Sequence, residues 1–202
     1  MDTSGRVRDC RKTLYTIGHS TRELGEFLAI LVSYGIRRLI DVRTVPRSRR
    51  NPQFNKESLP RELKKAGIRY SHLKELGGLR RAKQDSANDG WRNASFRGFA
   101  DHMQTVEFEK GMKELLAHIQ EETVCIMCAE SLPWRCHRSL IADAVAVRGY
   151  CVMHIMGSSS LRAHVLHTFA RVQDGTISYP AAVHQDPASL KKSPSEGTMN
   201  TR

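Results

Sequence analysis

Hydrophobic residues along the chain alternate between short continuous runs and longer segments with helical spacing. A continuous apolar run is typical of a strand that is buried on both faces of a parallel sheet. The clearest run of this kind occupies residues 124–129, and further strands are predicted at 13–17, 37–42, 68–73 and 150–156. Between them, apolar residues at helical spacing predict amphipathic helices. The alternation predicts a single α/β domain, with a mostly parallel sheet flanked by helices in a Rossmann-like three-layer arrangement.

The predicted helices follow the strands in order. Ser20 and Glu23 have the spacing of a capping box, which predicts a helix behind them that ends at Gly35. Further helices are expected at residues 59–66, 94–103, 105–119, 136–147 and 161–171. The domain is expected to cover residues 13–179. It would lie between a basic N-terminal arm at 1–12 and a tail at 180–202, whose Ser, Pro, Lys and Thr content predicts disorder.

Polar side chains follow several predicted strands at the point where each strand ends. His19 and Ser20 follow the first strand, Asp41 and Arg43 close the second, and Glu130 follows the apolar run at 124–129. Because the carboxyl ends of parallel strands meet at one edge of a sheet, we expect these side chains to gather in one site. The candidate catalytic residues are therefore Asp41, Glu130, His19 and Arg43. Structural roles are the alternative, with His19 at a helix entry and Asp41 paired with Arg43.

The balance of charge favours a polyanionic partner. Lys and Arg total 32 against 21 acidic residues, which gives a formal net charge of +11. The arginines cluster along the chain, which favours nucleic acid over a merely basic, solvated surface. The chain has no run of about 18 apolar residues and no apolar signal-peptide core, so we expect a cytoplasmic protein without a membrane partner.

An arginine-rich loop directly follows Asp41 and Arg43. Residues 44–55 contain prolines and further arginines, so we expect an exposed loop that lies over the same edge of the sheet. Arginines in this place suit the positioning of a phosphate backbone whose chemistry takes place at the carboxylates. Aromatic residues predicted in loops, including Trp91 and Trp134, are available to stack on bases or, alternatively, to fill the edge of the core.

The five cysteines, in a chain without a secretory signal, favour free thiols and a reducing compartment. Cys125 and Cys128 look like half of a zinc knuckle, but their separation places them on opposite faces of a strand. The thiol of Cys136, at the start of a predicted helix, is expected to have a lowered pKa. A zinc site could draw on Cys128, Cys136, His137 and His154. Their spacing is not that of a standard zinc module, so we expect no metal and no other cofactor.

Several short motifs follow one another in a specific order. They are Tyr15-Thr16-Ile17-Gly18-His19-Ser20, Asp41-Val42-Arg43 with Pro46 and Ser48, Leu76-Gly77-Gly78, and Cys128-Ala129-Glu130 followed by Cys136-His137-Arg138. With these motifs, between residues 13 and 156, the chain resembles the DUF488 family. The resemblance implies a compact α/β fold and a shared site made of the motif residues His19, Asp41, Arg43, Glu130, Cys136, His137 and Arg138. Some members of the family are associated with excision of modified bases from DNA.

The resulting hypothesis is a monofunctional DNA glycosylase that excises a modified or damaged base, such as a 5-substituted pyrimidine, from duplex DNA. Asp41 or Glu130 would orient water or stabilise the sugar cation. His19, His137 or Arg43 would support the departing base. The chain has no lysine that stands out as a Schiff-base nucleophile, which favours hydrolysis without lyase chemistry.

Substrate-binding roles are expected for a wider set of residues. They are Tyr15, Ser20, Arg47, Ser48, Arg49, Arg50, Phe54, Trp91, Trp134, Cys136, His137 and Arg138. Two other functions remain open. One is a nucleic-acid-binding module without catalysis, which the charge supports equally well. The other is a Cys- or metal-dependent enzyme that is centred on Cys136 and acts on a small molecule.

Overall fold

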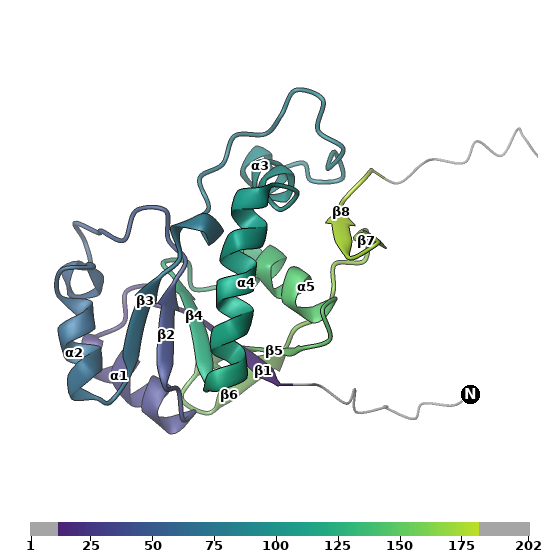
Figure 1. Ribbon diagram of the computed structural model, residues 1–202. Coiled ribbons are helices and arrows are strands. Elements are labelled where there is room, and N and C mark those ends of the chain that lie inside the picture. The colour runs from purple at the N-terminus through teal and green to yellow at the C-terminus, as the bar shows by residue number, and fades with distance from the viewer. Residues whose placement is uncertain (1–11, 182–202) are drawn as a thin grey trace, which may run out of the picture.

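Six strands form the central sheet in the computed structural model, which describes residues 12–181 (Figure 1). In chain order they are β1 Thr13–Gly18, β2 Arg38–Asp41, β3 Arg69–His72, β4 Val124–Cys128, β5 Cys151–Gly157 and β6 Ser160–Ala163. Their order across the sheet is β3-β2-β4-β1-β5-β6. All neighbours are parallel except β5 and β6, which are antiparallel. The predicted strands and the mostly parallel sheet are therefore confirmed.

The strand β4 shows why a continuous apolar run predicts this fold. All of its residues are buried. Val124, Ile126 and Cys128 belong to the hydrophobic cluster on one face of the sheet. Cys125 and Met127 belong to the cluster on the other face. Both faces of β4 are thus covered, and Cys125 and Cys128 point to opposite sides, as predicted from their separation along a strand.

Helices cover both faces of the sheet and complete the three layers (Figure 1). The elements on one face are α1 Leu24–Ser33 and α2 Leu59–Lys65. Those on the other face are α3 Ala94–His102, α4 Val106–Glu121 and α5 Arg138–Ala146. In α4 the apolar residues at helical spacing are buried at Phe108, Met112, Leu115 and Ile119, while Leu116 is only half-buried. The three-layer α/β arrangement is confirmed.

The start of α1 differs from the predicted capping box. The residue that precedes the helix is Glu23, and no side chain caps it. Ser20 instead has a positive φ of 50°, and its backbone N–H donates to the carbonyl of Ala129 at 3.0 Å. The prediction was wrong because the chain at Ser20 is still pairing with the segment that follows β4, so the helix begins later than the sequence pattern indicates.

The helix predicted at 161–171 is also wrong. This segment opens with β6, which pairs with the edge strand β5, and it ends at the first residue of β7 Arg171–Gln173, which pairs with β8 Thr176–Ser178. Leu161 and Val165 would share one face of a helix, but they are 40% and 77% exposed. An unpaired sheet edge gains ladder hydrogen bonds from an added strand, and this gain outweighs a weak helical pattern.

Other predictions concern the chain termini and the membrane. The expected arm at 1–12 and tail at 180–202 fall almost entirely outside the described residues. Within residues 12–181, no helix is both long enough and apolar enough to cross a membrane.

Candidate functional site

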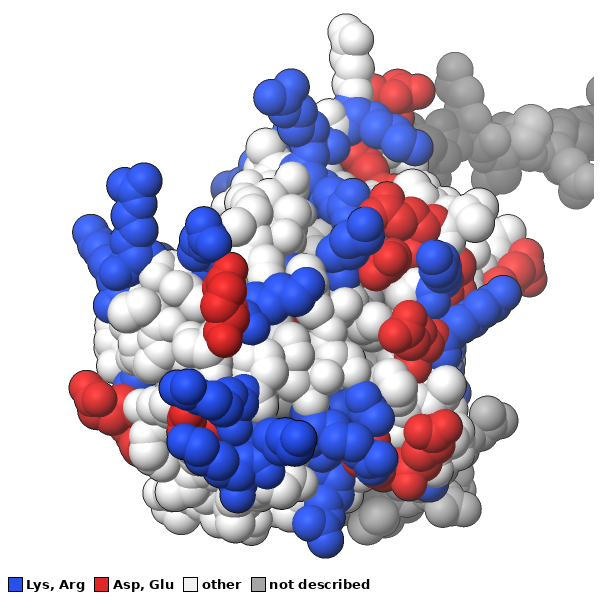
Figure 2. Space-filling view, turned by 60° about the vertical axis from the view of Figure 1, so that its left-hand side comes forward, with Lys and Arg blue, Asp and Glu red and all other residues white. Residues whose placement is uncertain are grey.

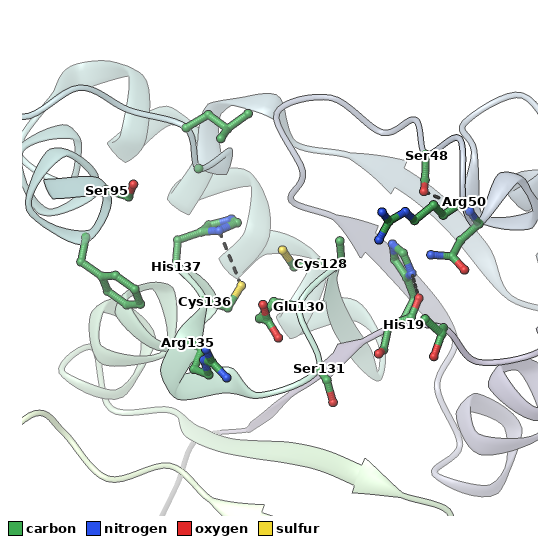
Figure 3. Close-up of a pocket in the computed structure, with 17 residues that line it drawn as sticks. His19, Ser48, Arg50, Ser95, Cys128, Glu130, Ser131, Arg135, Cys136 and His137 are labelled. Carbon is green, nitrogen blue, oxygen red and sulfur yellow. Dashed lines mark hydrogen bonds between the residues drawn. The ribbon is translucent and has the colours of Figure 1, made fainter. Parts of the chain in front are cut away.

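A pocket opens near the edge of the sheet where β1 and β4 end (Figure 3). Its volume is about 530 Å³, which is within the range of pockets that hold small organic ligands. Its walls come from the segments that follow these strands, from the loop after β2 and from the start of α3. The predicted site residues that line it are His19, Ser20, Ser48, Arg50, Glu130, Cys136 and His137.

A close approach of two backbones shapes the wall of the pocket next to Glu130. Beyond the end of β1, the N–H of His19 donates to the carbonyl of Cys128 at 2.9 Å. A Cβ atom on Gly18 would lie only 1.9 Å from the carbonyl oxygen of Glu130. Only glycine fits here, because the obstructing atom belongs to the backbone. Gly18 therefore allows the segment after β4 to lie against β1, and this contact sets the position of the Glu130 backbone.

Glu130 presents its carboxylate to the pocket. Its side chain is exposed and lines the cavity, as Figure 3 shows. Among residues 12–181, no hydrogen bond or ion pair involves this carboxylate. The backbone carbonyl of Glu130, in contrast, accepts a hydrogen bond from Nη2 of Arg138 at 2.6 Å. Glu130 is thus held through its backbone while its side chain remains available for a ligand.

Asp41, the other candidate carboxylate, lies behind the pocket wall. It is completely buried, and it accepts hydrogen bonds from Nε and Nη2 of Arg43 at 2.9 and 2.5 Å. The hydroxyl of Tyr70 donates to it at 3.0 Å. Burial and the charge of Asp41 raise the pKa of Tyr70. Asp41 and Arg43 are therefore close to the site, as the sheet topology predicts, but they neutralise each other and do not line the cavity.

His19 lines the pocket with both ring nitrogens already paired. Nε2 accepts from Nη1 of Arg43 at 3.2 Å, so Nδ1 carries the proton and donates to the carbonyl of Ser20 at 2.8 Å. The ring stacks on Phe54, with centroids 4.3 Å apart. Burial, together with the nearby charge of Arg43, lowers the pKa of His19 to about 4. The imidazole is therefore neutral near pH 7 and serves as a fixed wall of the site.

Two thiols and an imidazole meet on the opposite side of the pocket from His19 (Figure 3). Sγ of Cys128, Sγ of Cys136 and one ring nitrogen of His137 all lie within 4.8 Å of one another. Nδ1 of His137 is 3.6 Å from Sγ of Cys136, and Nε2 donates to the carbonyl of Val42 at 3.0 Å. His154, the fourth residue of the metal set considered from the sequence, lies elsewhere and contacts Thr16 and His164.

The cysteines differ in their ionisation. Burial raises the pKa of Cys136, but the neighbouring Cys128 thiol and the Arg138 guanidinium outweigh it and lower that pKa to about 6. The contact with Cys136, together with burial, raises the pKa of Cys128 to about 12. Cys125, Cys128 and Cys136 are free thiols. Cys151 is disulfide-bonded, so the expectation of free thiols is wrong at that position.

Arg138 is a buried cation that organises the floor of the site. Its side chain is 1% exposed. Nη1 donates to Oγ1 of Thr16 at 3.2 Å, and Nη2 donates to the carbonyls of Glu130 and Ser131 at 2.6 and 3.2 Å. In the described part of the chain, no carboxylate pairs with this guanidinium. Arg138 is predicted as a substrate-binding residue, but its contacts are those of a group that holds the segment after β4.

The arginine-rich loop divides between the pocket and the surface. Ser48 and Arg50 line the cavity. Arg47 forms an exposed ion pair with Glu57 at 2.9 Å and lies with Arg49 at a neighbouring depression. Figure 2 shows that Lys and Arg outnumber Asp and Glu on one face of the molecule. The loop therefore contributes positive charge to the surface around the site, with Arg50 at the site itself.

Several aromatic residues that were predicted to bind substrate do not line the cavity. They are Tyr15, Phe54, Trp91 and Trp134. Trp91 packs against Phe96 and Phe169, with centroids 4.7 and 4.9 Å apart, and so fills the edge of the core. Trp134 lies below Arg162, which is 4.9 Å from the ring centroid. Phe96, which stacks on Trp91, lines the pocket itself.

Some residues of the pocket were missed by sequence reasoning. Arg135, Leu79 and Ser95 line it. Arg135 stands between the predicted residues Trp134 and Cys136, so its position in that loop was a usable signal. Leu79 directly follows the Leu76-Gly77-Gly78 motif, so its position was also a usable signal. Ser95 lies in a segment without a motif, and only the tertiary structure brings it to the site.

Comparison with known proteins identifies the family. A family model described as a domain of unknown function, DUF488, matches residues 23–145. The match includes Asp41, Glu130 and the Cys-His-Arg motif, but ends short of His19 on the N-terminal side. No curated protein and no solved structure gives a significant match. Because the matched residues make up more than half of the chain, the protein belongs to the DUF488 family.

Proposed function

We propose that the protein is a monofunctional DNA glycosylase that hydrolyses the N-glycosidic bond of a modified or damaged base bound in the pocket. One observation carries the proposal. Glu130 presents a carboxylate without a partner among residues 12–181 to a cavity of about 530 Å³. A flipped base needs a pocket of this kind, with polar groups that read its edge.

The chemistry assigned to Glu130 follows from the reaction. Breaking the bond between base and sugar develops positive charge on the sugar, which a nearby carboxylate stabilises, and the same carboxylate orients the attacking water. The departing base carries negative charge. Arg50 and Arg135, which are exposed and line the pocket, are permanently charged donors for it or for the flanking phosphates.

Asp41 has a different role in this proposal. Its oxygens are engaged by Arg43 and Tyr70, and it is fully buried. A carboxylate in that position cannot reach a sugar in the cavity. Asp41 positions Arg43, which in turn holds the His19 ring and the carbonyl of Phe54. Of the two carboxylates proposed from the sequence, Glu130 is therefore assigned to catalysis.

DNA as the partner is supported by charge. The formal net charge is +11. In the loop after β2, the exposed Arg50 lines the cavity, and the exposed Arg47 and Arg49 lie at a neighbouring depression. Contacts of this type hold phosphates and carry no base specificity. Binding that weakens steeply as salt increases is therefore expected.

The test is excision from duplex oligonucleotides that each carry a single modified base, with 5-substituted pyrimidines included. Released base is detected by mass spectrometry, and abasic sites by alkaline cleavage. We expect release from at least one substrate, and a loss of about 100-fold or more in rate for Glu130→Gln. DNA affinity should stay unchanged. The matched control is Glu114→Gln, which alters a half-exposed carboxylate on α4.

Two outcomes contradict the proposal. Full excision by Glu130→Gln removes the catalytic assignment. Retention of every base by a protein that binds DNA in a salt-sensitive manner favours the non-catalytic nucleic-acid-binding module.

A further inference from the structure

We propose that Cys128, Cys136 and His137 form a binding site for a soft divalent cation, best matched by Zn²⁺, with one coordination position open to the pocket. This inference revises the sequence-based expectation of no metal. It is independent of the proposed glycosylase activity, because the site is built from ligand geometry and either conclusion can hold without the other.

The distances fit a tetrahedral zinc ion. A Zn–S bond of about 2.3 Å and a Zn–N bond of about 2.0–2.1 Å at the tetrahedral angle place sulfur and nitrogen about 3.6 Å apart. Sγ of Cys136 and Nδ1 of His137 are 3.6 Å apart. All three ligand atoms, including Sγ of Cys128, lie within 4.8 Å of one another, whereas two zinc-bound sulfurs are about 3.8 Å apart. Binding therefore needs only a small contraction of the group.

The imidazole is already oriented as a ligand. Nε2 of His137 donates to the carbonyl of Val42 at 3.0 Å, which fixes the proton on Nε2 and leaves the lone pair of Nδ1 toward the thiols. Metal-binding histidines are commonly held in this way by a backbone carbonyl. Gly78 lies beside the ring and leaves it room, because a Cβ atom at this position would stand 2.9 Å from Nδ1.

The three ligands come from two parts of the fold. Cys128 is the last residue of β4, and the other two stand between the short 3-10 helix Pro133–Arg135 and α5. This explains why the spacing along the chain matches no standard zinc module. The fold brings the three ligands together, because the chain turns back after β4 and places the start of α5 beside the end of that strand.

The open position indicates what the metal would do. All three ligands line the same cavity as Glu130. Zinc sites with three protein ligands and one free position bind water or substrate and act as Lewis acids. The fourth ligand would be a water molecule or a heteroatom of the bound molecule, within a pocket that also holds a carboxylate able to exchange protons with it.

The experiment measures metal without reference to activity. The full chain is produced in zinc-supplemented medium, purified under reducing conditions without chelators or metal-affinity resin, and analysed by plasma mass spectrometry. We expect zinc equimolar with protein and loss of that zinc in Cys128→Ser and in Cys136→Ser. Cys125→Ser is the matched control, because it changes a buried thiol on the opposite face of β4 and should retain zinc.

A spectroscopic readout covers the case in which a serine variant fails to fold. Cobalt added to the metal-free wild-type protein should give a thiolate-to-cobalt charge-transfer band, and His137→Gln should weaken cobalt binding. Trace zinc with no such band overturns the inference, as does full zinc in Cys136→Ser or an equal loss in Cys125→Ser. If the protein binds zinc but excises no base, the metal site is supported and the glycosylase proposal fails. If the purified protein contains no zinc, gives no cobalt band and still excises a base, the glycosylase proposal is supported and the metal site fails.

Discussion

Replacing Asp41 by Asn tests whether this carboxylate is structural. Asp41 is fully buried, and its partner Arg43 is 6% exposed. The substitution keeps the size of the side chain and removes the negative charge, so the Arg43 guanidinium remains buried without compensation. Breaking a buried ion pair by removing one partner costs about 3–5 kcal/mol. This is a large share of the roughly 5–15 kcal/mol that stabilises a typical domain.

The assay is urea unfolding, with the free energy of unfolding extrapolated to water for each variant. Removing both charges in Asp41→Asn with Arg43→Met should restore part of the loss, because no unpaired charge is then left in the interior. Glu57→Gln is the control, since it breaks the exposed ion pair with Arg47 and should change the unfolding midpoint little. A loss below about 1 kcal/mol for Asp41→Asn, or strict additivity in the double variant, would refute the reasoning.

Two further predictions concern pH and backbone packing. Since burial lowers the pKa of His19 from 6.5 to about 4, the unfolded chain binds a proton at higher pH than the folded one. The contribution of His19 to stability is therefore full above about pH 6.5 and falls by about 3 kcal/mol as the pH decreases to about 4. Burial also lowers the pKa of His154, to about 3, so His154 adds to the same loss; urea unfolding across this range should show the combined slope, and His19→Gln should make it shallower without removing it. Gly18→Ala should lower the melting temperature and also excision, because its Cβ would collide with the carbonyl of Glu130. Gly25→Ala in α1 meets no atom within 4 Å and should instead add about 0.4–1 kcal/mol.

The position of the site could be predicted from the sequence because it depends only on where the parallel strands end. The apolar run that becomes β4 has both faces covered, so it was identifiable as an interior strand, and Glu130 directly follows it. The register pairs Asp41 with Met127 and Gly18 with Cys128. Strands that end at nearly the same level bring their following residues together, and this property needs no knowledge of side-chain packing.

The roles of the two carboxylates could not be predicted in the same way. Asp41 is the last residue of a strand with neighbours on both sides, and Arg43 lies close enough along the chain to bind it in a bidentate manner. Glu130 lies beyond its strand, where the chain has turned into the cavity. The sequence shows a carboxylate at the end of a strand in both cases. The difference depends on whether the side chain points into the sheet edge or away from it.

The contacts around the pocket divide its polar groups into two sets. On the β2 side, the polar groups of Asp41, Arg43 and His19 already form hydrogen bonds with one another or with backbone carbonyls. On the β4 side, the carboxylate of Glu130 and Nδ1 of His137, with its two thiol neighbours, face the cavity. A group that already has its partners loses them when it binds a ligand, and in a buried place this loss is costly. Ligand chemistry is therefore expected from the segment between β4 and α5, while the β2 side supplies rigidity and, through its arginine-rich loop, charge.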